Sequence, residues 1–527
     1  MRERTYKQKS NRMMSRNWRA VLLCAVFASV FCYQINITTR AAAGGLDLTF
    51  GSGGKVTTDL GLAVTDTGQA VAIQPDGKIV VAGSGCAGAG PCQDINVVRY
   101  NANGTLDASF GVGGKATAGL GASAFALSLQ SDGKIVIAGN THGSNIDFAV
   151  VRFNGNGSLD AAFGSGGVVT TDFFGGPDFV RGMAIQADGK IIIAGGAASP
   201  PGDGDFALAR YNPNGSLDST FDGDGKLTTR ISAFDETATA VAIQPDGRIV
   251  ASGSGLGFTL IRYDTGGSLD AGFGAGGIAS AFGGVGLAMA LQPDGRIVLA
   301  GFGGSLFDFA VARFDAAGHL DPAFGSGGII VTPMGGENIA FAVAIQSDGR
   351  ILAGGYATNA VTGRDFAIAR YNFNGALDPT FGVGGKIFTD FSGGEDLAFG
   401  LALQTDGKIV AAGFASGSST AQDFAVARYD AGNFCLQDDR TGDRVSFNPD
   451  TGAYLFTQCG AKGVTVGGVG KVIRSQCQIE IKQENANQNV LVLFDPCRLR
   501  GSATITASGK TFVIADSETS KNTCTCP

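Results

Sequence analysis

The chain has little histidine and, beyond its first segment, no tryptophan. Among 527 residues the histidines are His142 and His319, and the single tryptophan is Trp18. Neither histidine has beside it a serine, cysteine or aspartate in an arrangement typical of nucleophilic catalysis, so the sequence predicts no catalytic residue. Without tryptophan, a platform for stacking sugars would have to use tyrosine or phenylalanine. An enzyme is therefore the second interpretation of this sequence.

Positive charge and long apolar runs are also scarce. The net charge is −7, and the first 43 residues hold eight Lys or Arg against one Glu, which leaves about −14 for the remainder. Nucleic acids and anionic lipids are bound through clustered positive charge, so neither is an expected partner. Beyond residue 43 no apolar stretch is long enough to cross a bilayer, and we expect no membrane insertion there.

The first 43 residues have the three parts of a secretory signal. Residues 2–19 are basic, residues 20–31 are apolar, and three small residues, Ala41 to Ala43, follow. The sequence predicts a signal peptide over 1–43 and a protein that is secreted or held at the cell surface. The alternative is an uncleaved anchor with a single span, for which the apolar run is short.

Cysteine usage fits an oxidising compartment. The chain holds ten cysteines, and removing Cys24 and Cys32 with the signal leaves an even number. Cys86 and Cys92 share one short loop, so we expect them to form a disulfide with each other. The other six are crowded near the C-terminus and predict a stapled module over 433–527, with their pairing open: Cys435, Cys459, Cys477, Cys497, Cys524 and Cys526.

Glycine, at 84 residues, and repetition are what the sequence has in excess. A phrase of the type Gln-Pro-Asp-Gly-Lys, flanked on both sides by short apolar segments, recurs throughout. An Asp-Gly pair between two such segments predicts a tight turn in a β-hairpin. The copies begin at Gln74, Gln130, Gln186, Gln244, Gln292, Gln346 and Gln404.

Two further phrases complete each repeat. One reads Leu-Asp-x-x-Phe and precedes a glycine-rich turn and a short strand; the other resembles Asp-Phe-Ala-Val-x-Arg-Tyr, as at residues 365–371. The units recur every 48 to 58 residues, and each predicts four strands. Strands that are apolar on both faces need cover on both faces, which stacked sheets around an axis provide. We therefore predict an all-β, seven-bladed β-propeller of four-stranded antiparallel blades over 44–432. A calcium-binding β-solenoid would need a period of about nine residues instead.

The ends of the repeat array predict how the ring closes. The seventh unit ends at Tyr429 without a Leu-Asp phrase, whereas the array begins with one at Leu46-Asp47 that no preceding strand claims. We expect residues 46–59 to supply the outer strand of blade seven, which would remove two exposed sheet edges.

These three phrases resemble the delta-60 repeat, a bacterial β-propeller repeat of secreted or surface proteins. The resemblance covers about residues 46–430, seven times in fixed order. It implies propeller architecture and a place outside the cytoplasm, and it implies no shared reaction.

Residues 433–527 depart from the repeat. Segments with alternating polar and apolar residues, such as residues 478–481 and 490–494, predict strands. With its six cysteines, this part is predicted to be a small, disulfide-rich, β-sandwich-like domain.

Arginine and aspartate each occupy one fixed position in every repeat. A side chain placed identically in all blades is typical of a structural role, and Arg with Asp forms strong bidentate pairs. We predict structural pairing of Arg99, Arg152, Arg210, Arg262, Arg313, Arg370 and Arg428 with Asp47, Asp107, Asp160, Asp218, Asp270, Asp321 and Asp378.

Acidic residues outside the repeated phrases precede the inner strand in five blades. We expect these loops to surround one mouth of the central channel, where a partial negative ring could bind calcium or another cation. The alternative is that each acid caps backbone N–H groups of its own loop. The residues are Asp66, Asp178, Asp235, Glu236, Glu337, Glu395 and Asp396.

Taken together, the sequence favours a secreted, monomeric, non-enzymatic β-propeller that binds an extracellular protein or polysaccharide or serves as a surface scaffold, with no cofactor unless calcium binds. The alternative is an extracellular polysaccharide lyase or hydrolase that uses the carboxylates at the channel mouth. A third interpretation is an envelope protein with a purely structural role.

Overall fold

The computed structural model describes residues 43–61, 65–86, 94–143, 145–199, 203–232, 234–417 and 422–431, together with short strands between 434 and 515. Contacts divide the chain into two compact units. One unit is Ala41–Gly432, and Asn433–Pro527 belongs to the other. Among the described residues, no helix has the length and hydropathy needed to span a bilayer.

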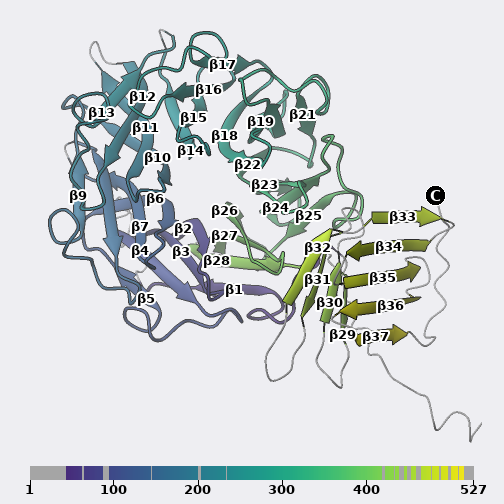
Figure 1. Ribbon diagram of the computed structural model, residues 1–527. Coiled ribbons are helices and arrows are strands. Elements are labelled where there is room, and N and C mark those ends of the chain that lie inside the picture. The colour runs from purple at the N-terminus through teal and green to yellow at the C-terminus, as the bar shows by residue number, and fades with distance from the viewer. Residues whose placement is uncertain are drawn as a thin grey trace, which may run out of the picture. The chain divides into compact units, whose positions relative to one another are not determined.

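The first unit is a ring of four-stranded antiparallel sheets (Figure 1). Six of its blades are continuous in sequence, and within each the strands pair in chain order. Blades one to three are β2 Thr65–Ile73, β3 Ile79–Cys86, β4 Asp94–Tyr100, β5 Lys115–Thr117; β6 Ala122–Leu129, β7 Ile135–Thr141, β8 Phe148–Phe153, β9 Val168–Thr171; and β10 Asp178–Ile185, β11 Ile191–Ser199, β12 Asp203–Tyr211, β13 Lys226–Thr229.

The second half of the ring repeats this plan, and the seven blades predicted from the repeats are confirmed. Blades four to six are β14 Thr237–Ile243, β15 Ile249–Ser254, β16 Phe258–Tyr263, β17 Ile278–Ala281; β18 Gly284–Leu291, β19 Ile297–Gly303, β20 Asp308–Phe314, β21 Ile329–Thr332; and β22 Asn338–Ile345, β23 Ile351–Asn359, β24 Gly363–Tyr371, β25 Lys386–Thr389.

Blade seven is built from both ends of the repeat array. Its strands β26 Asp396–Leu403, β27 Ile409–Ser416 and β28 Gln422–Tyr429 come from the last repeat. Its outer strand is β1 Lys55–Thr58, which pairs antiparallel with β28 from Lys55↔Ala427 to Thr58↔Phe424. The N-terminal strand therefore closes the ring, as the unmatched Leu-Asp phrase predicts. One parallel bridge, Thr65↔Gln422, also links blades seven and one.

The core lies between blades. One cluster, for example, packs Val136 and Val150 of blade two against Ile191 and Ile193 of blade three, all fully buried. This arrangement explains why strands two and three of each repeat are apolar on both faces, because each face meets a neighbouring blade. Hydrophobic burial therefore ties neighbouring blades to each other.

Each inner strand carries a bulge that requires a glycine opposite it. In blade three the register shifts between Val180 and Gly182, and the bulged backbone meets Gly195 of β11. A Cβ atom built on Gly195 would lie 1.8 Å from the carbonyl oxygen of Phe179. The same glycine recurs in every blade, as Gly83, Gly139, Gly195, Gly253, Gly301, Gly355 and Gly413, because no side chain fits beside the bulge.

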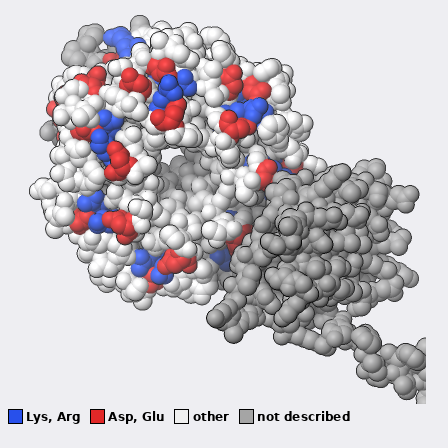
Figure 2. Space-filling view, in the orientation of Figure 1, with Lys and Arg blue, Asp and Glu red and all other residues white. Residues whose placement is uncertain are grey.

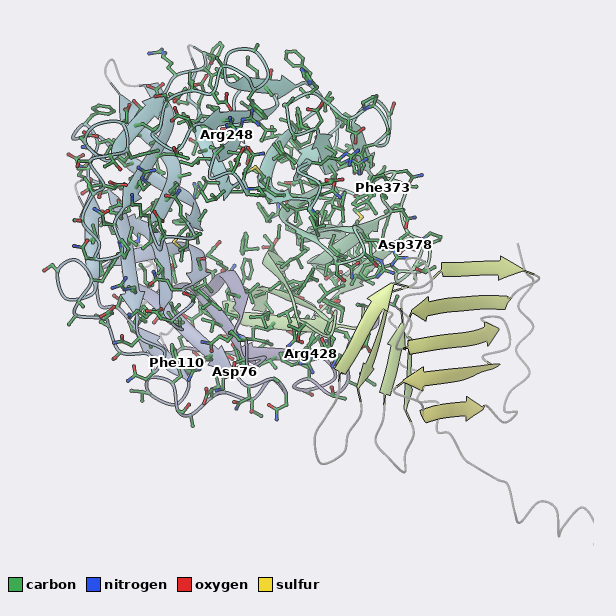
Figure 3. The ribbon with its side chains drawn as sticks, viewed as in Figure 1. Asp76, Phe110, Arg248, Phe373, Asp378 and Arg428 are labelled. Carbon is green, nitrogen blue, oxygen red and sulfur yellow. The ribbon has the colours of Figure 1, made fainter. Side chains whose placement is uncertain are left out.

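Strand direction gives the ring two distinct faces. Because the strands alternate, the starts of the first and third strands and the ends of the second and fourth share one face, which we call the loop face. The Asp-Gly turns and the Leu-Asp phrases lie on the opposite face, which we call the turn face. Labelled turn-face residues such as Asp76, Arg248 and Asp378 are distributed around the ring (Figure 3).

The second unit contains two antiparallel sheets. One is β29 Phe434–Gln437, β30 Arg444–Phe447, β31 Ala453–Thr457, β32 Thr465–Val469; the other is β33 Lys471–Ser475, β34 Gln478–Asn485, β35 Gln488–Asp495, β36 Arg500–Ala507, β37 Lys510–Ala515. Its sandwich-like packing and all predicted disulfides stay predictions, because the side chains concerned lie outside the described residues. The predicted signal peptide also lies outside them, apart from Ala43.

Candidate functional site

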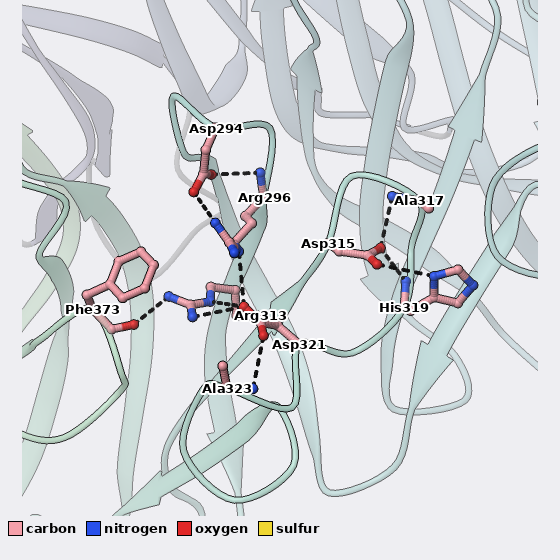
Figure 4. Close-up of polar contacts among 9 residues, drawn as sticks. All are labelled: Asp294, Arg296, Arg313, Asp315, Ala317, His319, Asp321, Ala323 and Phe373. Carbon is pink, nitrogen blue, oxygen red and sulfur yellow. Dashed lines mark hydrogen bonds and ion pairs between the residues drawn. The ribbon is translucent and has the colours of Figure 1, made fainter.

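The turn face carries the same buried ion pair in every blade. In blade five, the Arg313 Nε donates to Asp321 Oδ2 at 2.9 Å (Figure 4). The Arg313 guanidinium also lies 4.5 Å from the centre of the Phe324 ring. The Arg313 Nη1 reaches into blade six and donates to the carbonyl oxygen of Phe373 at 2.6 Å. One arginine thus connects two repeats.

The other six arginines make the same contacts. Each donates from Nε to its partner aspartate at 2.7–2.9 Å: Arg99 to Asp107, Arg152 to Asp160, Arg210 to Asp218, Arg262 to Asp270, Arg370 to Asp378, and Arg428 to Asp47. Each also bonds a backbone carbonyl of the next blade, namely that of Gly155, Pro213, Thr265, Ala316, Ala431 and Ala102 respectively.

Lysine or arginine from the Asp-Gly turn adds to most of these pairs, so charges of both signs occur together at intervals around the turn face (Figure 2). Every charge of this repeated set is used to hold blades together. The turn face therefore carries the same charged contacts in every blade. The differences between blades lie on the loop face.

On the loop face, four of the predicted acids share one position. Asp66, Asp178, Glu236 and Asp396 each lie eight residues before the repeated glutamine, and all four are buried. One oxygen of each accepts a backbone N–H of the preceding loop at 2.6–2.9 Å, from Leu60, Phe173, Ile231 and Phe391 respectively. The capping role considered as the alternative is therefore present in the structure.

The other three predicted acids occupy different positions and are exposed. Asp235 accepts a hydrogen bond from the Gly204 N–H at 2.8 Å. Glu337 accepts one from the Tyr356 hydroxyl at 2.9 Å. Glu395 precedes the buried Asp396. The structure does not bring the seven predicted acids together in one group, because four of them share one position between blades and the other three are exposed. The partial ring at the channel mouth stays a prediction.

The acids gather instead in three separate groups within the described residues. The contact between neighbouring blades is here called a junction and is named by the two blades. Oxygens of the three carboxylates in each group lie within 4.8 Å of one another: Asp59, Asp66 and Asp423 at junction seven-one; Asp147, Asp172 and Asp178 at junction two-three; and Asp365, Asp390 and Asp396 at junction six-seven.

Sequence reasoning missed two members of each group. Asp147, Asp365 and Asp423 open the third repeated phrase, and Asp59, Asp172 and Asp390 immediately follow an outer strand. The available signal was the six- or seven-residue spacing between the acid after the outer strand and the acid on the next inner strand. It points to one site only after the blades are stacked.

Burial and mutual repulsion disturb the titration of these groups. Burial, opposed by the hydrogen bond from Leu60 and reinforced by Asp59 and Asp423, raises the pKa of Asp66 to about 6. The same causes raise the pKa of Asp178 to about 6 and that of Asp396 to about 7. Burial and then a neighbouring carboxylate also raise the pKa of Asp147 and of Asp423. In each group, burial and the neighbouring carboxylates therefore disfavour the ionised form of the buried aspartate.

The two histidines have different surroundings. His142 Nε2 lies 2.8 Å from the Ser123 hydroxyl on the loop face, in the blade whose inner strand begins with Ala122. His319 lies on the exposed turn-face loop and contacts the Asp315 carboxylate at 3.2 Å (Figure 4). Within the described part of the chain, no carboxylate contacts His142 to complete a catalytic triad.

A shallow depression lies at the outer rim between blades two and three. Its volume is about 690 Å³. The lining includes Leu120, Ser165, Thr170 and Asn214, and none of its lining side chains is ionisable. It therefore lacks the acid and base that glycoside cleavage needs.

Large apolar side chains are exposed on the loop face. Phe282 is 82% exposed, Phe234 77% and Leu306 62%. Phe234 belongs to junction three-four, Phe282 to junction four-five and Leu306 to junction five-six. Among the described residues, none of these junctions holds a group of three carboxylates. The loop face thus carries both acid groups and exposed apolar side chains.

Known proteins support the architecture. Seven segments match the family model described as "Domain of unknown function (DUF5122) beta-propeller", over residues 74–110, 130–163, 186–221, 244–273, 292–324, 346–381 and 404–432. A comparison with curated proteins found no match.

Among solved structures, the chain is similar to the extracellular domain of a proposed one-component system from B. thetaiotaomicron, with 11% identity and a TM-score of 0.41, covering 88% of this chain and 58% of that one. It is similar to a protein of unknown function from Dyadobacter fermentans, with 12% identity and a TM-score of 0.38, covering 71% and 97%. It is also similar to an α-L-arabinanase from Penicillium chrysogenum complexed with arabinobiose, with 11% identity and a TM-score of 0.36, covering 71% and 94%.

The chain spans only 58% of the first of these proteins. Likenesses this distant say nothing about activity. Each of the seven blades contains one match to this family model, so the chain is similar to that repeat β-propeller family.

Proposed function

We propose that this protein is a secreted, monomeric, non-enzymatic binding module that holds an extracellular protein partner against its loop face. We also propose that the repeats are of the bacterial delta-60 type, because the three phrases recur in that order. The observation that carries the proposal is the exposure of Phe282 and Phe234, at 82% and 77%, on adjacent junctions of one face.

Exposed apolar side chains on neighbouring loops favour a binding role. Monomeric proteins rarely expose contiguous apolar patches unless these have a function. Phe307 extends the same region, because it is 51% exposed and follows Leu306. Its backbone φ is 55°, a left-handed value that is costly for a bulky residue. Strain of this kind persists where the surrounding structure holds it, as the contact between the Phe302 and Phe307 rings does at 5.3 Å.

A protein partner fits this surface better than a polysaccharide. The position of the buried acid is taken by Gly284 at junction four-five, next to the exposed Phe282 and Gly283. Sugars need polar groups beside an aromatic ring to bind their hydroxyls. Protein interfaces instead have apolar and aromatic centres, which this part of the loop face provides.

The enzyme alternative has a different requirement. It would use the grouped carboxylates, but Asp66, Asp178 and Asp396 are at most 1% exposed. An acid or base for glycoside cleavage has to contact the sugar. The geometry therefore supports binding more than catalysis.

The test compares three forms of the full secreted chain. These are the wild type, a Phe234→Ser/Phe282→Ser variant, and a control Val112→Ser/Val383→Ser variant that alters side chains 87% and 86% exposed on turn-face loops. Each form is immobilised, and retention of proteins from the envelope and medium of the producing cell is quantified. The expected result is a protein retained by the wild type and the valine variant and lost with the phenylalanine variant.

Two results would overturn this proposal. Equal retention by all three forms would remove the loop face from the interaction. Binding to a polysaccharide panel that survives the phenylalanine substitutions would favour a lectin-like role, and release of oligosaccharides that stops with Asp178→Asn would favour the enzyme.

A further inference from the structure

Junction seven-one brings together carboxylates from three separate strands. Asp423 lies on β28 of blade seven, Asp59 follows β1 of the same blade, and Asp66 lies on β2 of blade one. One oxygen of each lies within 4.8 Å of the others. The same three positions are acidic at junctions two-three and six-seven, so the arrangement occurs three times in one chain.

A second observation is that each group contains a buried carboxylate oxygen without a hydrogen-bond partner. Asp66 is 1% exposed, and Asp178 and Asp396 are 0% exposed. While Oδ2 of each caps a backbone N–H, the buried Oδ1 of each has no hydrogen-bond partner. At junction six-seven the Oδ1 of Asp365 is also buried without a partner. Leaving a buried carboxylate oxygen unpaired is costly, so these oxygens require a cation or a donor.

The remaining four junctions differ in the residues at these three positions. Junction three-four has Asp205 and Glu236, but Arg230 stands where the other junctions have the acid after the outer strand. At junction five-six, Asn338 replaces the buried acid and donates from Nδ2 to Asp308 Oδ1 at 3.1 Å. Junction one-two retains only Asp94, and junction four-five has no acid at these positions. Junction three-four, with two acids, thus has Arg230 at the third position, whereas none of the three positions is cationic where all three acids are present.

The nearby lysines do not fill this role. Lys115, Lys226 and Lys55 each donate from Nζ to the backbone carbonyl oxygen of Asp59, Asp172 and Asp390 respectively, at 2.6–3.1 Å. Lys386 makes the same contact with the carbonyl of Pro333 at junction five-six, where the acid group is missing. This lysine therefore links blades at junctions with and without the acid group. Its single positive charge offsets only part of the negative charge of the three carboxylates.

We propose that junctions seven-one, two-three and six-seven each bind one Ca²⁺ ion through these three carboxylates. Ca²⁺ takes oxygen ligands at about 2.3–2.6 Å, so two ligands on opposite sides of the ion lie about 4.8 Å apart. The three oxygens of each group lie within this distance of one another, so one ion could contact all three. Mg²⁺ demands near-ideal octahedral geometry, usually keeps several of its waters and is bound by one or two carboxylates, so three protein carboxylates favour Ca²⁺.

A bound ion at each of these junctions would join the third and fourth strands of one blade to the first strand of the next. At junction seven-one it would fix the residue after β1, the strand that closes the ring, beside the single bridge between Thr65 and Gln422. The three ions would therefore stabilise the closure and two further junctions. This role is independent of which partner the loop face binds.

The experiment titrates Ca²⁺ into the full secreted chain after removal of divalent ions, by calorimetry and by thermal unfolding. The expected result is three binding equivalents, one for each acid group, and a melting temperature that is higher in Ca²⁺ than in chelator. The titration extends to roughly 10 mM, since extracellular calcium modules bind with dissociation constants of about 10⁻⁴–10⁻³ M. An equal response to Mg²⁺ would overturn the assignment to calcium.

Single variants assign the sites. Asp66→Asn, Asp178→Asn and Asp396→Asn each keep an oxygen that can cap the loop N–H, and each should remove one binding equivalent. The matched controls Asp235→Asn and Glu337→Gln change loop-face acids outside the groups and should leave all three equivalents in place.

The wild-type measurement needs no variant, so a folding defect cannot hide the result. Absence of binding heat together with identical melting in Ca²⁺ and in chelator would refute the proposal. Binding that persists undiminished when all three aspartates are replaced would do so too.

Discussion

Arg428 and Asp47 form a buried ion pair although 381 residues separate them in the chain, with the Nε to Oδ2 distance at 2.9 Å. In the other six blades the paired arginine and aspartate are eight residues apart. The Asp47 carboxylate also contacts Lys408 at 2.9 Å. Burial alone would raise the pKa of Asp47, but hydrogen bonds from Lys408 and Thr49 and the charge of Arg428 hold it well below its usual range. This pair joins the two ends of the repeat array.

Replacing Asp47 by alanine should therefore open the ring as well as destabilise it. Removing one partner of a buried ion pair costs about 3–5 kcal/mol, because the other charge stays buried. Release of β1 would also expose the edge of β28 to another molecule. Thermal unfolding and light scattering measure the two effects, and we expect a lower melting temperature with association.

Asp160→Ala is the matched control, because Arg152 and Asp160 make the same contact within a continuous blade. It should lower the melting temperature while the protein stays monomeric. Association by both variants, or by neither, would contradict a specific role of Asp47 in closure.

Gly195→Ala should be strongly destabilising. The added Cβ would lie 1.8 Å from the Phe179 carbonyl oxygen, so the bulge of β10 would have to move. We expect a loss of more than about 3 kcal/mol, measured by urea unfolding. Gly155→Ala is the control, since its Cβ would meet its nearest neighbour at 3.4 Å. A loss for Gly195→Ala as small as that of the control would show that the bulge is not rigid.

Stability should fall steeply at alkaline pH because of tyrosines that bond across junctions. Tyr211, for example, donates its hydroxyl to Thr171 of the preceding blade at 2.7 Å. Burial raises the pKa of five such tyrosines above their usual value near 10: Tyr100, Tyr211, Tyr263, Tyr371 and Tyr429.

The sign follows from the protons bound. Above about pH 10 the unfolded chain loses these protons and the folded chain keeps them, so the unfolding free energy falls by up to about 1.4 kcal/mol per pH unit for each tyrosine. Tyr211→Phe should cost about 1 kcal/mol near pH 7 and make the alkaline decline shallower. Urea unfolding near pH 7 and above pH 10 measures both effects. If the unfolding free energy of the wild type and of Tyr211→Phe fell equally with pH, the prediction would be contradicted.

Arg230→Asp should create a fourth calcium site. It would give junction three-four an acid at each of the three positions, alongside Asp205 and Glu236. We expect one additional binding equivalent in the calcium titration, and lower stability in chelator because Arg230 no longer supplies a charge. Arg230→Gln should lower the stability in chelator in the same way but should add no calcium-binding equivalent. An unchanged stoichiometry for Arg230→Asp would mean that three acids at these positions are insufficient for binding.

Local sequence predicts much of this fold. The Asp-Gly turns, the strands flanking them and the closure by residues 46–59 all follow from phrases that recur at fixed positions, because turn chemistry and strand periodicity are local properties. The sequence also predicts the structural pairs, such as Arg152 with Asp160, because an arginine and an aspartate each occupy one fixed position in all seven repeats.

The acid groups could not be assembled in this way. Asp66 and Asp178 were noticed as departures from the repeat, but their partners Asp423 and Asp147 belong to a phrase that looks uniformly structural in sequence. The sequence also assigns Glu337 and Glu395 to the acidic ring because they are acidic and close to that position. They lie one residue before the position of the buried acid, and this difference in register exposes them to solvent.

The sequence by itself determined the number of blades, the position of each strand and the strand that closes the ring, since these depend on hydrophobic pattern and turns within one repeat. Only the tertiary structure decided which acids meet, which of their oxygens stay unpaired, and which face exposes Phe234 and Phe282. The physical reason is that each junction is formed by the end of one repeat and the start of the next, so its charge balance arises only when neighbouring blades are packed together.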